Sequence, residues 1–272
     1  MGPFSAAFLR FLVASFFLWI VVYRIEKDAI TRNWKHLGIL ALLGLSGIFT
    51  YNYFFFSGLK YVQAGRAAII IANNPIMISL FSALIFREKI TGLKIIGIFL
   101  SVSGAIWAIS RGNFAEIFSQ FGIGEIYISL CVVSWVFYTL LGKAIMVKLS
   151  PLISVAYSTA IGMILLFIPA LYEGVHKDIG NFSITAWISI FFLGFFGTVL
   201  GFLWYYQGIQ MIGPMRASIF INFVPISAII LSYFLLNEAI SLSLLGGAIL
   251  VITGIYLTNV SGIIQKSKKP AS

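Results

Sequence analysis

Cysteine and charged residues are scarce in this chain of 272 residues. A single cysteine, Cys131, excludes an intrachain disulfide. Charged residues make up 10% of the sequence, whereas 60% of the residues are hydrophobic. A soluble protein cannot bury so much apolar surface, because much of its own surface must face water. The composition therefore predicts that most of the surface faces lipid.

Acidic residues are especially few, and all eight fall in loops or close to the ends of apolar stretches. A proton pump usually places carboxyl or imidazole groups in the middle of the membrane. Glu125, a few residues inside its stretch, is the one candidate for such a group. We therefore expect a solute to move down its own gradient or by exchange.

Motifs for catalysis are missing as well. The sequence contains no HExxH motif, no paired acids and no Cys/His cluster. An intramembrane enzyme would need one of these sets. The sequence therefore favours a protein that is not an enzyme, and it implies no metal and no cofactor.

Long apolar stretches are what the sequence has instead. A membrane span needs roughly 20 apolar residues, and its backbone must satisfy its own hydrogen bonds. Nine stretches qualify, which predicts an all-α membrane protein with nine transmembrane helices and no soluble domain. They are 4–24, 36–58, 66–86, 91–110, 122–146, 151–173, 185–209, 214–236 and 241–262.

The net charge of +10 reflects basic residues in the loops. Alternate loops carry thirteen Lys and Arg on one side of the membrane and four on the other. This asymmetry is the positive-inside signal, so it does not indicate nucleic acid. It predicts a multi-pass protein of the cytoplasmic (inner) membrane, with the basic tail 263–272 in the cytoplasm.

An internal repeat organises the chain. Residues 58–104 meet identical residues at 13 of 47 positions when the sequence is shifted by 150. We therefore predict two copies of one unit, 1–110 and 122–262, in which five helices per copy would make the second copy inverted. The first copy has no counterpart of 122–146, because Met1 aligns with Pro151. A first helix is thus predicted to be missing, either through a late start or because the protein has nine helices.

The repeated pattern resembles a known family, the EamA branch of the drug/metabolite transporter superfamily. The residues that form the pattern are Arg66, Pro75, Glu88, Gly97 and Gly104 in the first copy. Their counterparts in the second copy are Arg216, Pro225, Glu238, Gly247 and Gly254. The resemblance implies ten helices in two inverted halves, and export or exchange of small metabolites such as amino acids.

Paired proline interruptions at matching positions of two halves point to a transport site. Pro75 should free the carbonyl of Ile71 within its helix, and Pro225 that of Ile221. Neighbouring amides either satisfy those carbonyls or face a solute. The amide candidates are Asn73, Asn74 and Asn222.

Aromatic and amide residues within other spans complete the predicted cavity. Trp135 and Tyr138 share one face near the centre of 122–146, where aromatic residues are unusual because they prefer the interfaces. The other candidates are Tyr51, Asn52, Tyr205 and Gln207; an aromatic belt at the interface is the alternative for the last two.

Charged residues at helix ends have simpler interpretations. Arg66 and Arg216 are predicted as interfacial anchors, or as contacts for an anionic solute at each mouth. Glu88 and Glu238 are predicted to stabilise the positive ends of the helices that follow. Arg10, inside the first span, is expected to extend to the interface.

These residues together predict a secondary transporter for neutral or zwitterionic solutes, amino acids above all. Its partners would be a small-molecule metabolite and the lipid bilayer. The alternative is a membrane scaffold or receptor that transports nothing. Inverted symmetry with matched proline breaks favours the transporter, because a scaffold does not require it.

Overall fold

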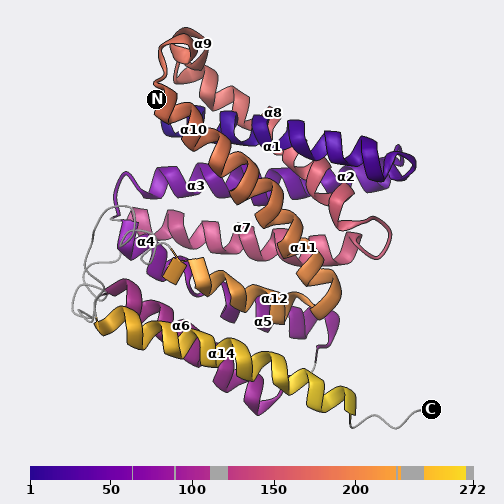
Figure 1. The fold of residues 1–272 in the computed structure, drawn as a ribbon, viewed down its shortest axis with the longest axis vertical. Coiled ribbons are helices and arrows are strands. Elements are labelled where there is room, and N and C mark those ends of the chain that lie inside the picture. The colour runs from indigo at the N-terminus through magenta and orange to yellow at the C-terminus, as the bar shows by residue number, and fades with distance from the viewer. Residues whose placement is uncertain (63, 89, 111–121, 225, 228–241, 268–272) are drawn as a thin grey trace. The chain divides into compact units, whose positions relative to one another are not determined.

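The computed structural model describes the chain except for residues 63, 89, 111–121, 225, 228–241 and 268–272 (Figure 1). It also leaves the side chains of 64–66, 109–110, 244 and 261–267 undescribed. The described residues form helices joined by short turns. The predicted all-α class is therefore confirmed.

Six helical stretches in the described part of the chain are long and apolar enough to cross a membrane. They are Pro3–Ile25, Trp34–Gly58, Ala67–Phe86, Ile123–Ile145, Pro151–Tyr172 and Ile184–Ile212. Two shorter apolar helical stretches, Gly92–Ala108 and Leu245–Val260, match two more of the predicted spans. The protein is therefore a multi-pass membrane protein, whereas the count of nine spans stays a prediction.

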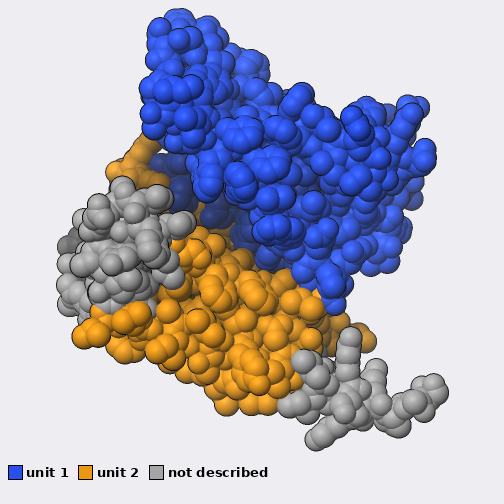
Figure 2. Space-filling model, viewed as in Figure 1, with its two compact units in different colours: residues 1–57, 133–211 blue, residues 58–132, 212–272 orange. Residues whose placement is uncertain are grey.

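Two compact units make up the chain, shown in different colours in Figure 2. Unit 1 consists of Met1–Ser57 and Val133–Met211, and unit 2 of Gly58–Val132 and Ile212–Ser272. Each unit combines part of the first predicted repeat with part of the second. The compact units therefore differ from the predicted repeats 1–110 and 122–262.

Unit 1 is built on the apolar helices α1 (Pro3–Ile25) and α8 (Pro151–Tyr172), which pack against each other. Ser150 begins α8, because its hydroxyl accepts a hydrogen bond of 3.1 Å from the Ile153 amide. The Glu173 carboxylate accepts hydrogen bonds from the amides of Phe4 and Ser5, at 3.2 and 2.7 Å. This carboxylate at the end of α8 thus satisfies free amides at the start of α1.

Two stretches of π-helix interrupt the other long spans of unit 1. The span from α2 (Trp34–Leu43) to α3 (Tyr51–Gly58) contains η2 (Gly44–Thr50). The span from α10 (Ile184–Phe192) to α11 (Gly201–Ile212) contains η5 (Leu193–Leu200). The two segments occupy equivalent positions of the predicted repeat. Since π-helical turns occur frequently at functional sites, this pair directs attention to what surrounds it.

Glycine lets each π segment approach a neighbouring helix closely. A Cβ atom at Gly44 would lie 2.7 Å from the carbonyl oxygen of Ser158 in α8. A Cβ atom at Gly194 would lie 2.9 Å from the carbonyl oxygen of Arg10 in α1. Neither position has room for a larger residue, because the obstructing atom is backbone.

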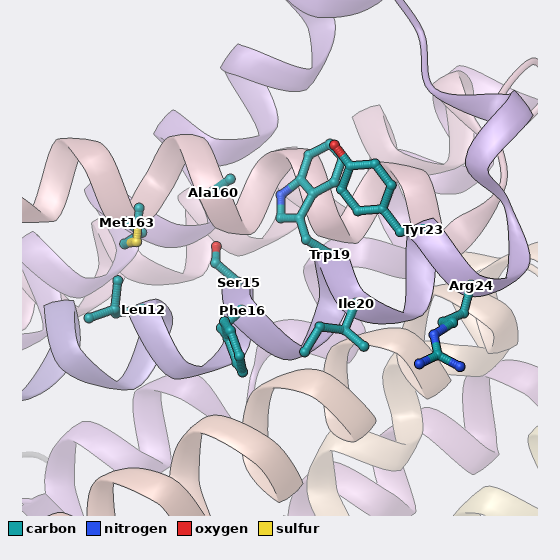
Figure 3. A pocket seen from close by; sticks show the side chains of 9 residues that line it. All are labelled: Leu12, Ser15, Phe16, Trp19, Ile20, Tyr23, Arg24, Ala160 and Met163. Carbon is teal, nitrogen blue, oxygen red and sulfur yellow. The ribbon is translucent and has the colours of Figure 1, made fainter.

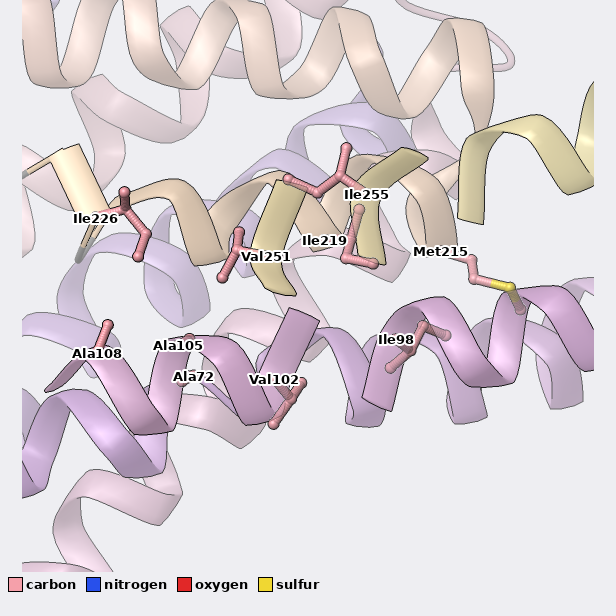
Figure 4. Packing of buried hydrophobic residues seen from close by; sticks show 10 residues of the cluster. All are labelled: Ala72, Ile98, Val102, Ala105, Ala108, Met215, Ile219, Ile226, Val251 and Ile255. Atoms are coloured by element: carbon pink, nitrogen blue, oxygen red, sulfur yellow. The ribbon is translucent and has the colours of Figure 1, made fainter. Parts of the chain in front are cut away.

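Unit 2 contains α4 (Ala64–Ile71), α5 (Asn74–Phe86), α6 (Gly92–Ser110), α12 (Pro214–Ser218), η6 (Ile219–Asn222) and α14 (Leu242–Ser267). Helices α6 and α14 meet antiparallel at glycines. A Cβ atom at Gly97 or Gly104 would lie 2.6 Å from the carbonyl oxygen of Gly254 or Gly247, respectively. Small residues allow such close contact between membrane helices. The buried core of unit 2 lies beside this contact, with Val102 and Ala105 on α6 and Val251 on α14 (Figure 4).

The interruption before Pro75 differs from the expected kink in a continuous helix. Helix α4 ends at Ile71 and α5 begins at Asn74, so Pro75 is the second residue of a new helix. Its missing N–H costs nothing there, because amides in the first turn of a helix have no intrahelical partner. The Asn73 side-chain amide donates to Ile69 O at 3.0 Å and to Ile70 O at 3.3 Å, so it bonds backbone carbonyls just before the interruption.

Candidate functional site

Six aromatic side chains gather inside unit 1, and we call them the aromatic cluster. They are Tyr51, Trp135, Tyr138, Phe202, Tyr205 and Tyr206. The ring centroid of Trp135 lies 5.5 Å from Tyr51, 5.3 Å from Tyr138, 5.5 Å from Phe202 and 5.6 Å from Tyr205. The structure thus brings together four of the predicted cavity residues and places Trp135 at their centre.

The two π segments position this cluster. Tyr51 is the first residue after η2, and Phe202 is the second residue after η5. Trp135 and Tyr138 come from α7 (Ile123–Ile145), one turn apart on the same face. Aromatic side chains of both predicted repeats therefore meet directly beyond the two interruptions.

Hydrogen bonds hold part of the cluster in place. The Tyr206 hydroxyl donates to the carbonyl oxygen of Tyr138 at 3.1 Å, and both side chains are fully buried. The hydroxyls of Thr139 and Tyr205 are 3.0 Å apart and share a hydrogen bond. Trp135, Tyr51, Phe202 and Tyr205, by contrast, are only partly buried. Part of the cluster therefore remains exposed.

Phe202 and Tyr206 were not among the predicted cavity residues. Both follow Thr198 at helical spacing, four and eight residues later, so a common face could have been read from the sequence. Asn52 and Gln207 do not add amides to the cluster. The Asn52 amide donates to Ile48 O within its own helix at 2.6 Å, and Gln207 is exposed.

The amide candidates Asn74 and Asn222 belong to unit 2, whereas the aromatic cluster belongs to unit 1. Asn74 and Asn222 are buried, with exposed fractions of 2% and 1%. The Asn222 amide donates to the Ser101 hydroxyl at 3.1 Å. Among the described residues, neither side-chain oxygen has a hydrogen-bond partner. Asn73, in contrast, uses its amide on the backbone of α4.

Two of the charged candidates of unit 2, Glu88 and Arg216, lie near Lys94. A Cβ atom at Gly213 would lie 3.0 Å from Glu88 Oε1, and Lys94 interacts electrostatically with both Glu88 and Arg216. The Thr91 hydroxyl accepts a hydrogen bond of 3.3 Å from the Lys94 amide at the start of α6. The Arg66 side chain, Pro225 and Glu238 lie outside what the structure describes.

A groove of about 760 Å³ runs between α1 and α8 (Figure 3). Its lining is apolar apart from a few polar atoms, and Arg24 stands at one end. The lining residues are Leu12, Ser15, Phe16, Trp19, Ile20, Tyr23, Arg24, Ala160 and Met163. At 100° per residue, Leu12, Ser15, Phe16, Trp19 and Tyr23 are turned away from Arg10, whereas Arg24 at the end of the helix is not. The groove therefore belongs to a different face of α1 from the one that contacts η5.

Metal-binding chemistry finds no support in the described ranges. No group of three His, Cys, Asp or Glu side chains there could hold a metal ion. What the described site offers is aromatic faces, hydroxyls and amides.

The family comparison decides what kind of protein carries this site. Residues 1–110 and 122–260 each match the EamA-like transporter family. The chain belongs to that family. The resemblance predicted from the repeated pattern is thereby confirmed, and the protein is a membrane transporter of the EamA-like type.

Similar proteins extend across bacteria and archaea. The uncharacterized transporter YyaM of Bacillus subtilis is 32% identical over 268 residues, which cover 98% of this chain and 87% of YyaM. An uncharacterized transporter of Archaeoglobus fulgidus is 31% identical over 257 residues, 94% of this chain and 88% of the relative. A protein of known crystal structure, 17% identical, shares the fold with a TM-score of 0.79 over 99% of this chain and 90% of its own.

Proposed function

We propose that this EamA-like transporter carries small neutral or zwitterionic metabolites, amino acids foremost, across the cytoplasmic membrane. The aromatic cluster is the observation that carries the proposal. Trp135 and Tyr51 offer partly exposed rings, and a ring face binds both apolar groups and an ammonium group through cation–π attraction.

The proposed mechanism is alternating access between two inverted halves. Tyr51 comes from the first predicted repeat, whereas Trp135, Phe202 and Tyr205 come from the second. A movement of one repeat against the other would change the spacing of these rings and so open or close the cluster. The two π segments support this mechanism, because they interrupt the helices directly beside the rings.

Exchange or facilitated movement suits the placement of the acids. Unit 1 is described throughout, and its acids are all near helix ends: Glu26, Asp28, Glu173 and Asp178. A proton-coupled carrier would be expected to hold a carboxyl group within its spans. Uptake that depended steeply on an imposed pH gradient would contradict this part of the proposal.

Counterflow in proteoliposomes tests the proposed transport. Unlabelled solute trapped inside should accelerate the uptake of the labelled solute, with a panel of neutral amino acids as probes. Trp135→Leu should reduce this uptake by about tenfold or more, because it removes the central ring. Trp19→Leu, which changes a tryptophan of the groove on α1, is the matched control and should retain it.

Failure would be equally informative. Folded wild-type protein that shows no counterflow with any amino acid would overturn the proposed solute class. If the Trp135 and Trp19 variants lost uptake equally, transport would not depend specifically on the aromatic cluster.

A further inference from the structure

Arg10 is a cation within an apolar helix, at the eighth of the 23 residues of α1. Contrary to expectation, its guanidinium does not extend to the interface. The Nε atom donates a hydrogen bond of 2.8 Å to the Thr198 hydroxyl, which is fully buried. Thr198 is the middle residue of the 29-residue span Ile184–Ile212. The side chain is therefore fixed at mid-span, where a charge is costly without a function.

Most of the donors of this guanidinium remain available. Arginine has five N–H donors, and the bond to Thr198 uses one of them. The Phe11 ring, 5.1 Å from Cζ, contributes a cation–π contact and no acceptor. In the described part of the chain, no carboxylate forms an ion pair with Arg10 and no acceptor bonds its terminal nitrogens.

The acids of unit 1, which the structure describes throughout, are engaged elsewhere or distant in sequence. Glu173 is the one at the same end of α1 as Arg10, and it accepts from the amides of Phe4 and Ser5. Glu26 lies beyond the opposite end of α1 and accepts from the Ser150 hydroxyl. The positive charge of Arg10 therefore has no counter-ion within its own unit.

The guanidinium also borders the aromatic cluster. The Phe11 ring, which lies 5.1 Å from Arg10 Cζ, has its centroid 6.2 Å from Phe202, a ring that is itself in contact with Trp135. The cation, Phe11 and the aromatic cluster thus pack in succession within unit 1.

Open space lies next to this cation. A Cβ atom at Gly197 would meet nothing nearer than Arg10 Nη2, at 4.0 Å. Gly197 is itself exposed, one residue before Thr198 in η5. A ligand can therefore approach the terminal nitrogens from the side of the π segment.

We propose that Arg10 binds the free carboxylate of the transported solute, while Thr198 orients the guanidinium. The planar fork of arginine matches a carboxylate with two parallel hydrogen bonds, and the bound anion neutralises the mid-span charge. The rest of the solute lies against the rings of Trp135 and Tyr51. This inference rests on the proposed transport and narrows its solutes to those that carry a carboxylate, so the corresponding carboxamides are rejected.

The test compares each neutral L-amino acid with its carboxamide, and adds isocaproate, a carboxylate that lacks an ammonium group. Binding is measured as ligand-induced thermal stabilisation of the detergent-solubilised protein, and transport as competition in counterflow. Carboxylates should bind the wild type about 30-fold or more tightly than carboxamides, in the range found when one partner of a buried charge pair is removed. Arg10→Gln should abolish that preference, whereas Arg10→Lys should keep part of it.

Arg24→Gln is the matched control, because Arg24 lies on the same helix but in its last turn, where it lines the groove. It should leave the carboxylate preference unchanged. Should Arg10→Gln fail to fold, the double variant Arg10→Ala with Thr198→Ile replaces it, since it exchanges the polar pair for an apolar one.

The outcomes separate this inference from the proposed transport. Counterflow without a carboxylate preference, or an Arg10 variant that weakens acid and amide equally, overturns the inference and leaves transport standing. Carboxylate binding that depends on Arg10 but produces no counterflow supports the inference and overturns transport. No binding and no counterflow with any probe overturns both.

Discussion

The two π segments of unit 1 have the same backbone but different surroundings. Segments η2 and η5 occupy equivalent positions of the predicted repeat, and each contains a glycine that faces a different kind of neighbour. A Cβ atom at Gly47 would overlap the Tyr138 ring, whereas a Cβ atom at Gly197 would meet only Arg10 Nη2, at 4.0 Å. The first segment is thus closed by an aromatic ring, and the second leaves space beside a cation.

A second difference follows at the next residue of each segment. Thr198 corresponds to Ile48 under the shift of 150, and Arg10 corresponds to Ala160. Arg10 of the first copy and Thr198 of the second form a hydrogen-bonded polar pair, whereas their counterparts Ala160 and Ile48 are apolar. The repeat therefore supplies the π segment twice, while the polar pair is present at one of the two equivalent positions. That asymmetry is what a binding site for an asymmetric solute requires.

Replacing Thr198 of η5 by the isoleucine found at the equivalent position of η2 should have the largest effect on stability. Thr198→Ile removes the acceptor of Arg10 Nε and leaves a buried cation without a protein partner, so the free energy of unfolding should fall by about 3 kcal/mol. Adding Arg10→Ala should restore at least ~2 kcal/mol, because an apolar pair replaces an unsatisfied charge. Reversible unfolding in mixed detergent micelles measures both variants. Strictly additive losses in the double variant would show that the two residues do not act as a pair.

Adding a side chain at Gly47 in η2 should lower the free energy of unfolding slightly less. Gly47→Ala places a methyl group against the Tyr138 ring, which is fully buried and cannot move aside freely. Overpacking of this kind costs about 1–3 kcal/mol. The same unfolding assay measures it, with Gly38→Ala as control, because a Cβ atom at Gly38 has no neighbour within 4 Å. Equal stability of the two variants would argue against the close contact of Gly47 with Tyr138.

The helices that follow the segments provide a smaller test. Tyr205 corresponds to Phe55 in the repeat, so Tyr205→Phe makes the two copies alike. The variant loses the hydrogen bond to Thr139, which should lower the free energy of unfolding by about 1 kcal/mol. Tyr53→Phe, at an exposed tyrosine, is the control and should change the unfolding free energy by less than ~0.5 kcal/mol. A loss of similar size in both would mean that the Tyr205 hydroxyl contributes nothing specific.

Composition predicted the spans well, because length and hydrophobicity are properties of a continuous stretch. The stretch 122–146 became α7, Ile123–Ile145, and 151–173 became α8, Pro151–Tyr172. The π segments were not predicted. Glycine and apolar residues suit an α-helix and a π-helix alike, so 36–58 carries no mark of the change at Gly44.

The sequence revealed site residues that are unusual for their position in a span. It did not reveal roles that depend on contact with a residue far away in the sequence. Trp135 and Tyr138 stood out as aromatic residues near the centre of a span, and the structure places them together. Arg10 was equally unusual, yet its role depends on Thr198, which is 188 residues away in sequence. A single sequence cannot reveal such a contact, so the expected extension to the interface was wrong.

The smallest expected effect falls on the open side of the comparison. Gly197→Ala adds a methyl group where the nearest atom is Arg10 Nη2 at 4.0 Å, an ordinary contact distance. The free energy of unfolding should therefore change by less than ~0.5 kcal/mol, as for other substitutions that meet no obstacle. Transport should respond more than stability does, because the methyl group narrows the approach to the guanidinium. Counterflow with a larger substitution, Gly197→Leu, should then fall further while carboxamides stay excluded. If Gly197→Ala destabilised the protein as much as Gly47→Ala, the space beside Arg10 would be filled and the two segments would be equivalent after all.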